Sequence, residues 1–279
     1  MNQSTIVNPP SLATIGIVST SSEQLPAQPA PRPWPLYPEP EPVFGMPEVV
    51  AAFLGVLLAV VACSAVATII AHHITAFSRV PTSQLANDPR VILPAQLAAY
   101  LMVFGILWRL FQHHRIGFFQ ALSWRWPLRW PLFVSGGVFL AVAVQLISHF
   151  LPTPPELPID QMMRSSTDAW LMSVFGVLIA PFAEEVFFRG LLFPALARRA
   201  GLLVSFVVTS VFFGIIHSQQ LAGAWIQITC IILVGAALTA IRWRFRSLAS
   251  STLVHVGYNG TLFLALFVQT RGFTNFSLK

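Results

Sequence analysis

The apolar stretch AWLMSVFGVLIAPFAEEVFFRGLLFPALA, residues 169–197, decides the fold class of this chain. It exceeds the ~20 residues that a helix needs to cross the hydrocarbon core of a bilayer, yet it holds Glu184, Glu185 and Arg189 near its middle. A segment in lipid must satisfy its own backbone hydrogen bonds, which favours helix. The stretch therefore predicts a transmembrane helix that tilts, kinks or projects, with Pro181 as the expected place for a kink.

Other apolar segments flank this stretch on both sides. The chain is 55% hydrophobic and 9% charged, with a mean hydropathy of +0.71, whereas soluble domains are about 25% charged. This composition excludes a soluble enzyme and predicts an all-α, polytopic transmembrane helix bundle of seven to eight spans. The apolar segments are residues 49–71, 91–112, 131–151, 169–197, 201–219, 222–241 and 247–269.

The charged loops between the segments predict an orientation in the membrane. Arginines gather in alternate loops, and such loops are cytoplasmic by the positive-inside rule. We therefore expect an integral, multi-pass membrane protein with its N-terminus in the cytoplasm and its C-terminal tail outside. The bias toward small residues and toward Arg over Lys favours a bacterial inner membrane. Because the arginines serve topology, the net charge of +6 does not indicate nucleic-acid binding. The arginines of these loops are Arg115, Arg125, Arg129, Arg198, Arg199, Arg242, Arg244 and Arg246.

The three charges within residues 169–197 are costly in a membrane and need a reason. Glu185 and Arg189 are four residues apart, which places them on one helical face as an ion pair. Glu184 points about 100° away from Glu185 and gains no such partner. The simplest alternative is a buried Glu–Arg pair that only joins helices, but an unpaired Glu184 beside it favours chemistry.

Two later segments contribute imidazoles at helical spacing. Phe213 and His217 are four residues apart, as are His255 and Asn259, so each pair shares a face. A lone His or Asn can simply bond across helices. Together with Glu184, in spans almost devoid of other polar residues, they predict convergence on one cavity.

Water activation is the chemistry that these residue types support. A carboxylate with a histidine can take a proton from water and return it to a leaving amine, while a second His and an Asn can donate to an oxyanion. Alternatively, Glu184, His217 and His255 can ligate Zn²⁺ and leave one position open for water. The sequence has no Gly-x-Ser-x-Gly elbow and no His-Glu-x-x-His helix, which makes serine-nucleophile and thermolysin-like designs fit less well.

Three motifs in this order resemble the CPBP family, which comprises the CAAX prenyl endopeptidases and the bacteriocin-processing, or Abi, proteins. The resemblance covers about residues 165–270 and implies a membrane-embedded endopeptidase, a hydrolase that cleaves a peptide or protein substrate near the membrane face. The motifs are Glu184-Glu185-x-x-x-Arg189, Phe213-x-x-x-His217 and His255-x-x-x-Asn259. The implied roles are Glu184 as general base assisted by His217, His255 with Asn259 on the oxyanion side, and Glu185 with Arg189 in support.

The resemblance leaves cofactor and activity open. It is compatible with a metalloprotease, in which Glu184, His217 and His255 would hold Zn²⁺, and with a metal-free glutamate mechanism. A non-catalytic membrane scaffold, or a bacteriocin-immunity or regulatory factor of the same family, is the alternative function. Besides the substrate, the lipid bilayer is the expected partner.

Four parts of the chain follow from these assignments. Half of the prolines lie in the first part, which predicts disorder or polyproline II there. The parts are a Pro-rich arm at 1–47, N-terminal transmembrane helices at 48–164, a CPBP-like protease core at 165–270 and a short tail at 271–279.

One expectation conflicts with the others. The segment bounds place Glu184 near the bilayer centre but His217 near the end of its span. Either the fifth span runs later than its hydropathy indicates, or Pro181 breaks the fourth segment, and the face to which the cavity opens depends on which holds.

Overall fold

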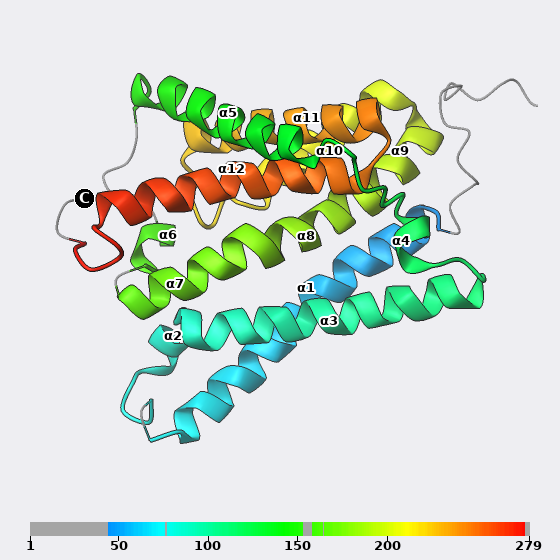
Figure 1. Ribbon diagram of the computed structural model, residues 1–279. Coiled ribbons are helices and arrows are strands. Elements are labelled where there is room, and N and C mark those ends of the chain that lie inside the picture. The colour runs from blue at the N-terminus through cyan, green and yellow to red at the C-terminus, as the bar shows by residue number, and fades with distance from the viewer. Residues whose placement is uncertain (1–43, 76, 153–157, 164, 277–279) are drawn as a thin grey trace, which may run out of the picture. The chain divides into compact units, whose positions relative to one another are not determined.

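The computed structural model describes residues 44–75, 77–152, 158–163 and 165–276, and these are helical with no strand (Figure 1). The chain divides into two units, Met1–Arg32 and Pro33–Lys279, and every described residue belongs to the second. The predicted Pro-rich arm at 1–47 lies outside the described residues except for its last four positions.

All seven apolar segments form helices, so the predicted helical bundle is confirmed. Six are long and apolar enough to span a membrane, and one is shorter. The long ones are α1 (Met46–His73), α3 (Pro89–His113), α5 (Trp130–His149), the continuous stretch Ser166–Ala200, α11 (Trp225–Phe245) and α12 (Leu248–Gln269). The shorter one is α10 (Leu202–Ile215), and single turns form α2 (Thr82–Leu85), α4 (Phe118–Ala121) and α6 (Pro158–Gln161).

Side-chain caps fix where several helices begin. The side chains of Asp88, Ser165 and Ser247 accept hydrogen bonds from backbone amides in the first turns of α3, α7 (Ser166–Val174) and α12. Arg90 also donates to Asp88 and lowers the pKa of its carboxyl. These caps set the entry points of the helices that frame the site.

The loops meet in two groups, as alternating spans require. The turn before α12 bonds to the loop before α5, through Leu248 N–H to Ser123 O at 3.1 Å and Ser247 Oγ to Arg125 O. In the other group, Ile159 N–H donates to Gln220 O at 3.3 Å. Two of the three Arg-rich loops, before α5 and before α12, thus lie together, which agrees with the alternation of charge in the sequence.

The long stretch Ser166–Ala200 lies between the α1 and α3 pair and α12 (Figure 1). Its helical hydrogen bonding continues past Pro181, so the predicted kink is not a break. Wide π-helical turns, η1 and η2, accommodate the chain instead, since a proline ring clashes with the carbonyl four residues earlier in an α-helix. The pieces are α7 (Ser166–Val174), η1 (Phe175–Ile179), α8 (Ala180–Glu185), η2 (Val186–Leu192) and α9 (Phe193–Ala200).

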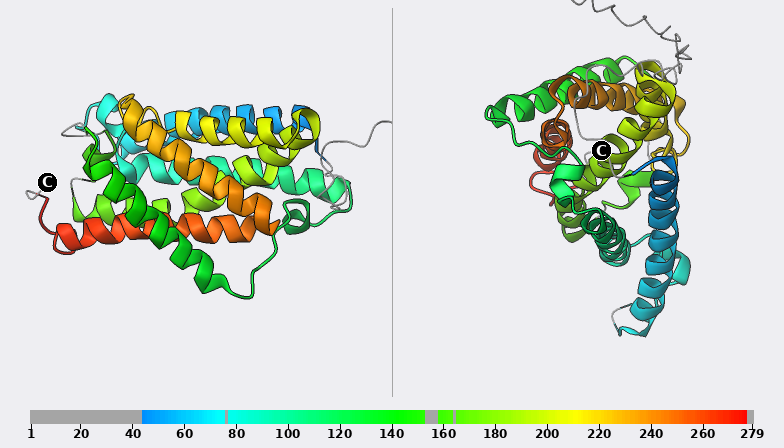
Figure 2. Two further views of the ribbon diagram at one scale, coloured as in Figure 1. Left: turned by 90° about the horizontal axis from the view of Figure 1, so that it is seen from above. Right: turned by 90° about the vertical axis from the view of Figure 1, so that its right-hand side faces the viewer.

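Helices α5 and α12 cross in direct contact (Figure 2). Two glycines make the approach possible, because a Cβ on Gly137 would overlap Val254 O and one on Gly257 would overlap Val134 O. Small residues at such crossings let helix backbones pack closely in membranes.

Gly137→Ala is therefore expected to force α5 away from α12 and to lower the thermal unfolding temperature in detergent. The neighbouring Gly136→Ala is a matched control, because nothing lies within 4 Å of the Cβ it would add. Equal unfolding temperatures for the two variants would contradict this crossing.

Candidate active site

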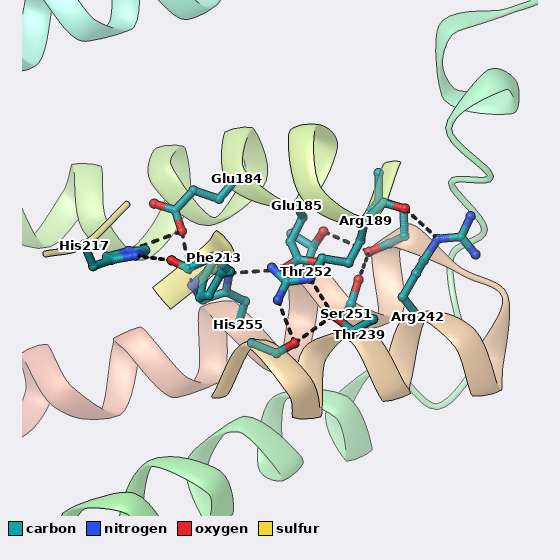
Figure 3. Close-up of polar contacts among 12 residues, drawn as sticks. Glu184, Glu185, Arg189, Phe213, His217, Thr239, Arg242, Ser251, Thr252 and His255 are labelled. Carbon is teal, nitrogen blue, oxygen red and sulfur yellow. Dashed lines mark hydrogen bonds and ion pairs between the residues drawn. The ribbon is translucent and has the colours of Figure 1, made fainter. Parts of the chain in front are cut away.

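Glu184, on α8, faces two imidazoles from other parts of the chain, His217 in the turn after α10 and His255 on α12 (Figure 3). Its Oε2 lies 3.9 Å from His217 Nε2 and 3.7 Å from His255 Nε2. The side chains of Glu184 and His217 are 19% and 16% exposed, whereas His255 is 4% exposed. The predicted convergence of these three residues is thus present, in a site open to solvent or substrate on the Glu184 side.

The other ring nitrogen of each histidine is already bonded. His217 Nδ1 lies 2.7 Å from Phe213 O, and His255 Nδ1 lies 3.3 Å from Glu185 Oε1. A carbonyl or carboxylate oxygen can only accept, so each Nδ1 donates. In the neutral imidazoles both Nε2 atoms then carry lone pairs toward Glu184. With both imidazoles neutral, three proton acceptors meet at one point, where a water molecule can donate to them.

Glu185 and Arg189 form the predicted ion pair, entirely out of solvent. Arg189 Nη1 donates to Glu185 Oε1 at 2.9 Å, and both side chains are 0% exposed. Glu185 therefore holds both Arg189 and His255, through the same oxygen. This carboxylate fixes the ring of His255, as a carboxylate does for a metal-bound or catalytic histidine.

Arg189 makes two further hydrogen bonds to α11. Nη2 donates to Gly235 O at 2.8 Å and Nε to Thr239 Oγ1 at 3.3 Å. The guanidinium also lies 4.3 Å from the centre of the Phe213 ring, a cation–π contact. Phe213 in turn touches both His217 and His255, with ring centroids 5.0 and 5.7 Å away. Arg189 and Phe213 thus tie η2, α10, α11 and α12 together behind the Glu184 carboxylate.

His217 reaches the level of Glu184 because α10 is short. Gly201, at φ +83°, turns the chain directly from α9 into α10. Glu184 lies 17 residues before this turn and His217 lies 16 residues after it. Because the chain reverses direction at the turn, the two side chains lie at the same level along the helix axes. Both of the explanations offered from the sequence are wrong, since the fifth helix ends early, at Ile215, and the fourth stretch is unbroken.

Residues 166–261 match the family model of the type II CAAX prenyl endopeptidase Rce1-like proteins. We call this matched segment the Rce1-like domain. The match confirms the resemblance seen in the three sequence motifs, and it includes every predicted site residue. Comparison with curated proteins and with solved structures finds no match.

The match of residues 166–261 to the Rce1-like family model supports a protease of the CAAX-endopeptidase type at the level of the family. The domain begins with α7 and ends within α12, close to the predicted core at 165–270. Together with the long apolar helices, the family indicates an integral membrane protein.

Asn259 stands apart from the rest of the predicted site. Its Nδ2 donates to Gly176 O at 2.7 Å, in η1, so this hydrogen bond ties its amide to η1 rather than to Glu184. It lies one turn after His255 on α12. The Rce1-like domain thus brings five of the six predicted residues into one contact network and leaves Asn259 attached to the neighbouring wide turn.

Two buried polar residues that hydrogen-bond to Arg189 were not predicted as part of the site. Arg242 was assigned to a loop, but it lies within α11, is 1% exposed and donates from Nε to Arg189 O at 3.2 Å. Thr239, which accepts from Arg189, has 0% exposure. Thr239 and Arg242 are three residues apart, which places them on one helix face and could have indicated a shared role. Arg242 was instead grouped with the neighbouring Arg244 and Arg246 as a loop charge.

The donor set of the Rce1-like domain suits a zinc ion in its chemistry. Two free Nε2 atoms and a carboxylate are zinc ligands, and each Nδ1 has the second hydrogen bond that orients such histidines. Among the described residues, however, no three His, Cys, Asp or Glu side chains already enclose a metal position. The 3.7 and 3.9 Å separations exceed the ~3.4 Å between two ligands of tetrahedral zinc, so the side chains would draw slightly inward.

Proposed function

We propose that this protein is an intramembrane endopeptidase that hydrolyses a peptide bond near the membrane face with water activated by Glu184 and His217. One observation carries the proposal: the carboxylate of Glu184 faces the Nε2 atoms of two imidazoles whose Nδ1 atoms are hydrogen-bonded elsewhere. A water placed between Glu184 and His217 has an acceptor for either proton, which is the requirement for general-base catalysis.

The reaction follows from the same acceptors. Glu184 takes one proton as the water oxygen bonds to the scissile carbonyl carbon, and His217 Nε2 accepts a hydrogen bond from the remaining O–H. The tetrahedral intermediate then collapses, the C–N bond breaks, and the proton on Glu184 passes to the leaving amine. His255, whose Nε2 lies 3.7 Å from Glu184, would donate to the oxyanion in its imidazolium form, with a second proton taken from solvent before the reaction and kept on the ring throughout the cycle.

Zinc is a second form of the same proposal, with Glu184, His217 and His255 as the residues that would hold it. A bound zinc ion would supply a water of lowered pKa. In either form, Glu185 keeps His255 oriented by accepting from Nδ1, and Arg189 keeps Glu185 in place.

Cleavage of a peptide library by the purified protein in detergent tests the proposal. His217→Ala is expected to reduce turnover about 10²-fold or more, the scale of a lost proton acceptor, while His149→Ala, an exposed histidine at the end of α5, leaves it unchanged. Peptide binding without cleavage, in wild type and variants alike, would contradict a protease and support the scaffold alternative. Loss of both activity and stoichiometric zinc on chelation would select the zinc form.

We further propose that the protein lies in a bacterial inner membrane with the Arg-rich group of loops in the cytoplasm. The support is the gathering of two of these loops, through the contacts of Leu248 and Ser247 with the loop before α5. A reporter fused after Lys279 is expected to be active outside the cytoplasm. Cytoplasmic activity of that reporter would reverse the orientation.

A further inference from the structure

Two wide helical turns flank the glutamates of the Rce1-like domain, and a proline ends each of them. In η1, Ala180 N–H donates to Phe175 O, and in η2, Phe193 N–H donates to Phe188 O. Both bonds span five residues rather than four, as in π-helix. Pro181 follows the first and Pro194 follows the second.

The prolines leave one carbonyl in each turn without its backbone donor. Continuing the five-residue register, residue 181 would donate to Gly176 O and residue 194 to Arg189 O. Neither can, because proline has no N–H. An unsatisfied carbonyl inside a membrane-spanning helix costs free energy. Prolines persist in such helices where neighbouring helices supply donors for the carbonyls left open.

A side chain from another helix supplies each missing donor. Asn259 Nδ2, on α12, donates to Gly176 O at 2.7 Å, and Arg242 Nε, on α11, donates to Arg189 O at 3.2 Å. The two carbonyls that the prolines leave open are thus the two that receive these bonds. Figure 3 shows Arg242 reaching the backbone at Arg189.

We propose that Asn259 and Arg242 are positioning residues that hold the two wide turns and so set the direction of Glu184 and Glu185 between them. A π turn adds one residue to a helical turn, and one residue corresponds to a rotation of about 100°. If either wide turn reverted to an α turn, Glu184 could no longer face α10 and α12 at once. Asn259 therefore acts through the backbone of η1 rather than by touching the reacting atoms. The kinetic consequence rests on the proposed protease function, whereas the hydrogen-bond assignment does not.

A double-substitution experiment tests the proposal. Asn259→Leu removes the donor at nearly the same shape, and Pro181→Ala restores a backbone N–H to η1. We expect Asn259→Leu alone to lower the unfolding temperature and to reduce kcat of the folded protein about 3- to 20-fold, the range of one such interhelical hydrogen bond, with little change in KM. In the Pro181→Ala background the same substitution should change kcat by less than about twofold and the unfolding temperature by less than about 1 °C.

A proline elsewhere supplies the matched control. Pro94 lies inside α3, so Asn259→Leu in a Pro94→Ala background should show its full loss of stability and kcat. The pair Arg242→Met and Pro194→Ala repeats the test at η2.

The possible results distinguish a failure of the hydrogen-bond assignment from a failure of the protease function. Equal losses of stability in the native and Pro181→Ala backgrounds would overturn the proposal, whether or not the protein cleaves peptides. Rescue of stability with no rescue of kcat would also overturn it, and would assign Asn259 to the oxyanion. If wild type cleaves nothing, the protease function fails, and the thermal measurements still decide the assignment of both hydrogen bonds.

Discussion

Glu184→Gln is expected to reduce peptide hydrolysis by about 10²- to 10⁴-fold, the contribution of a positioned general base. The substitution keeps the size of the side chain and its ability to hydrogen-bond, but an amide cannot take a proton from water. Because Glu184 is 19% exposed and has no part in the Glu185–Arg189 pair, the variant should fold normally. Steady-state cleavage with matched thermal unfolding of the same preparations measures both effects.

Glu48→Gln is the matched control for Glu184→Gln. Glu48 accepts a hydrogen bond from Gly45 N–H at the start of α1, 2.7 Å away, and a glutamine can accept that bond as well. Its activity should equal that of wild type. Equal activity in Glu184→Gln would remove this residue from the mechanism.

Arg189→Met is expected to destabilise the protein by about 3–5 kcal/mol, because it leaves the Glu185 carboxylate buried without its counter-charge. Glu185, Gly235 and Thr239 all lose the bonds that Arg189 gives them. Arg199→Met, an exposed arginine on α9, should have little effect. Thermal unfolding in detergent measures the difference.

The double variant Glu185→Gln with Arg189→Met separates loss of the charge pair from loss of packing. With both charges gone, no uncompensated charge stays buried, so the double variant should unfold at a higher temperature than Arg189→Met alone. It should nevertheless stay poorly active, because His255 no longer has a carboxylate at Nδ1. A double variant less stable than both single variants would contradict a coupled pair.

The fold was readable from the sequence because lipid allows few structures. Each apolar segment that was long enough became a helix, since its backbone had to bond within itself. The wide turns around Pro181 and Pro194 were not readable. They depend on donors, Asn259 and Arg242, that come from helices distant in the chain, and a proline alone indicates only a kink.

The site was predicted in part for similar reasons. The Glu185–Arg189 pair follows from a spacing of four on one helix. Glu184 lies outside that pair because successive residues on a helix point about 100° apart. The height of His217 was misjudged because hydropathy extended the fifth helix past Ile215. Arg242 was taken for a loop charge, since only the packing of α11 against η2 reveals that it is buried.

Cleavage in oxygen-18-labelled water, followed by mass spectrometry of the new carboxyl terminus, tests the central claim most directly. The claim is that Glu184, between His217 and His255, activates water for attack on a peptide bond. It predicts one heavy oxygen in the new terminus with wild-type protein and no such product above background with Glu184→Gln. A product from wild type without the heavy oxygen, or labelled product formed equally by Glu184→Gln, would contradict it.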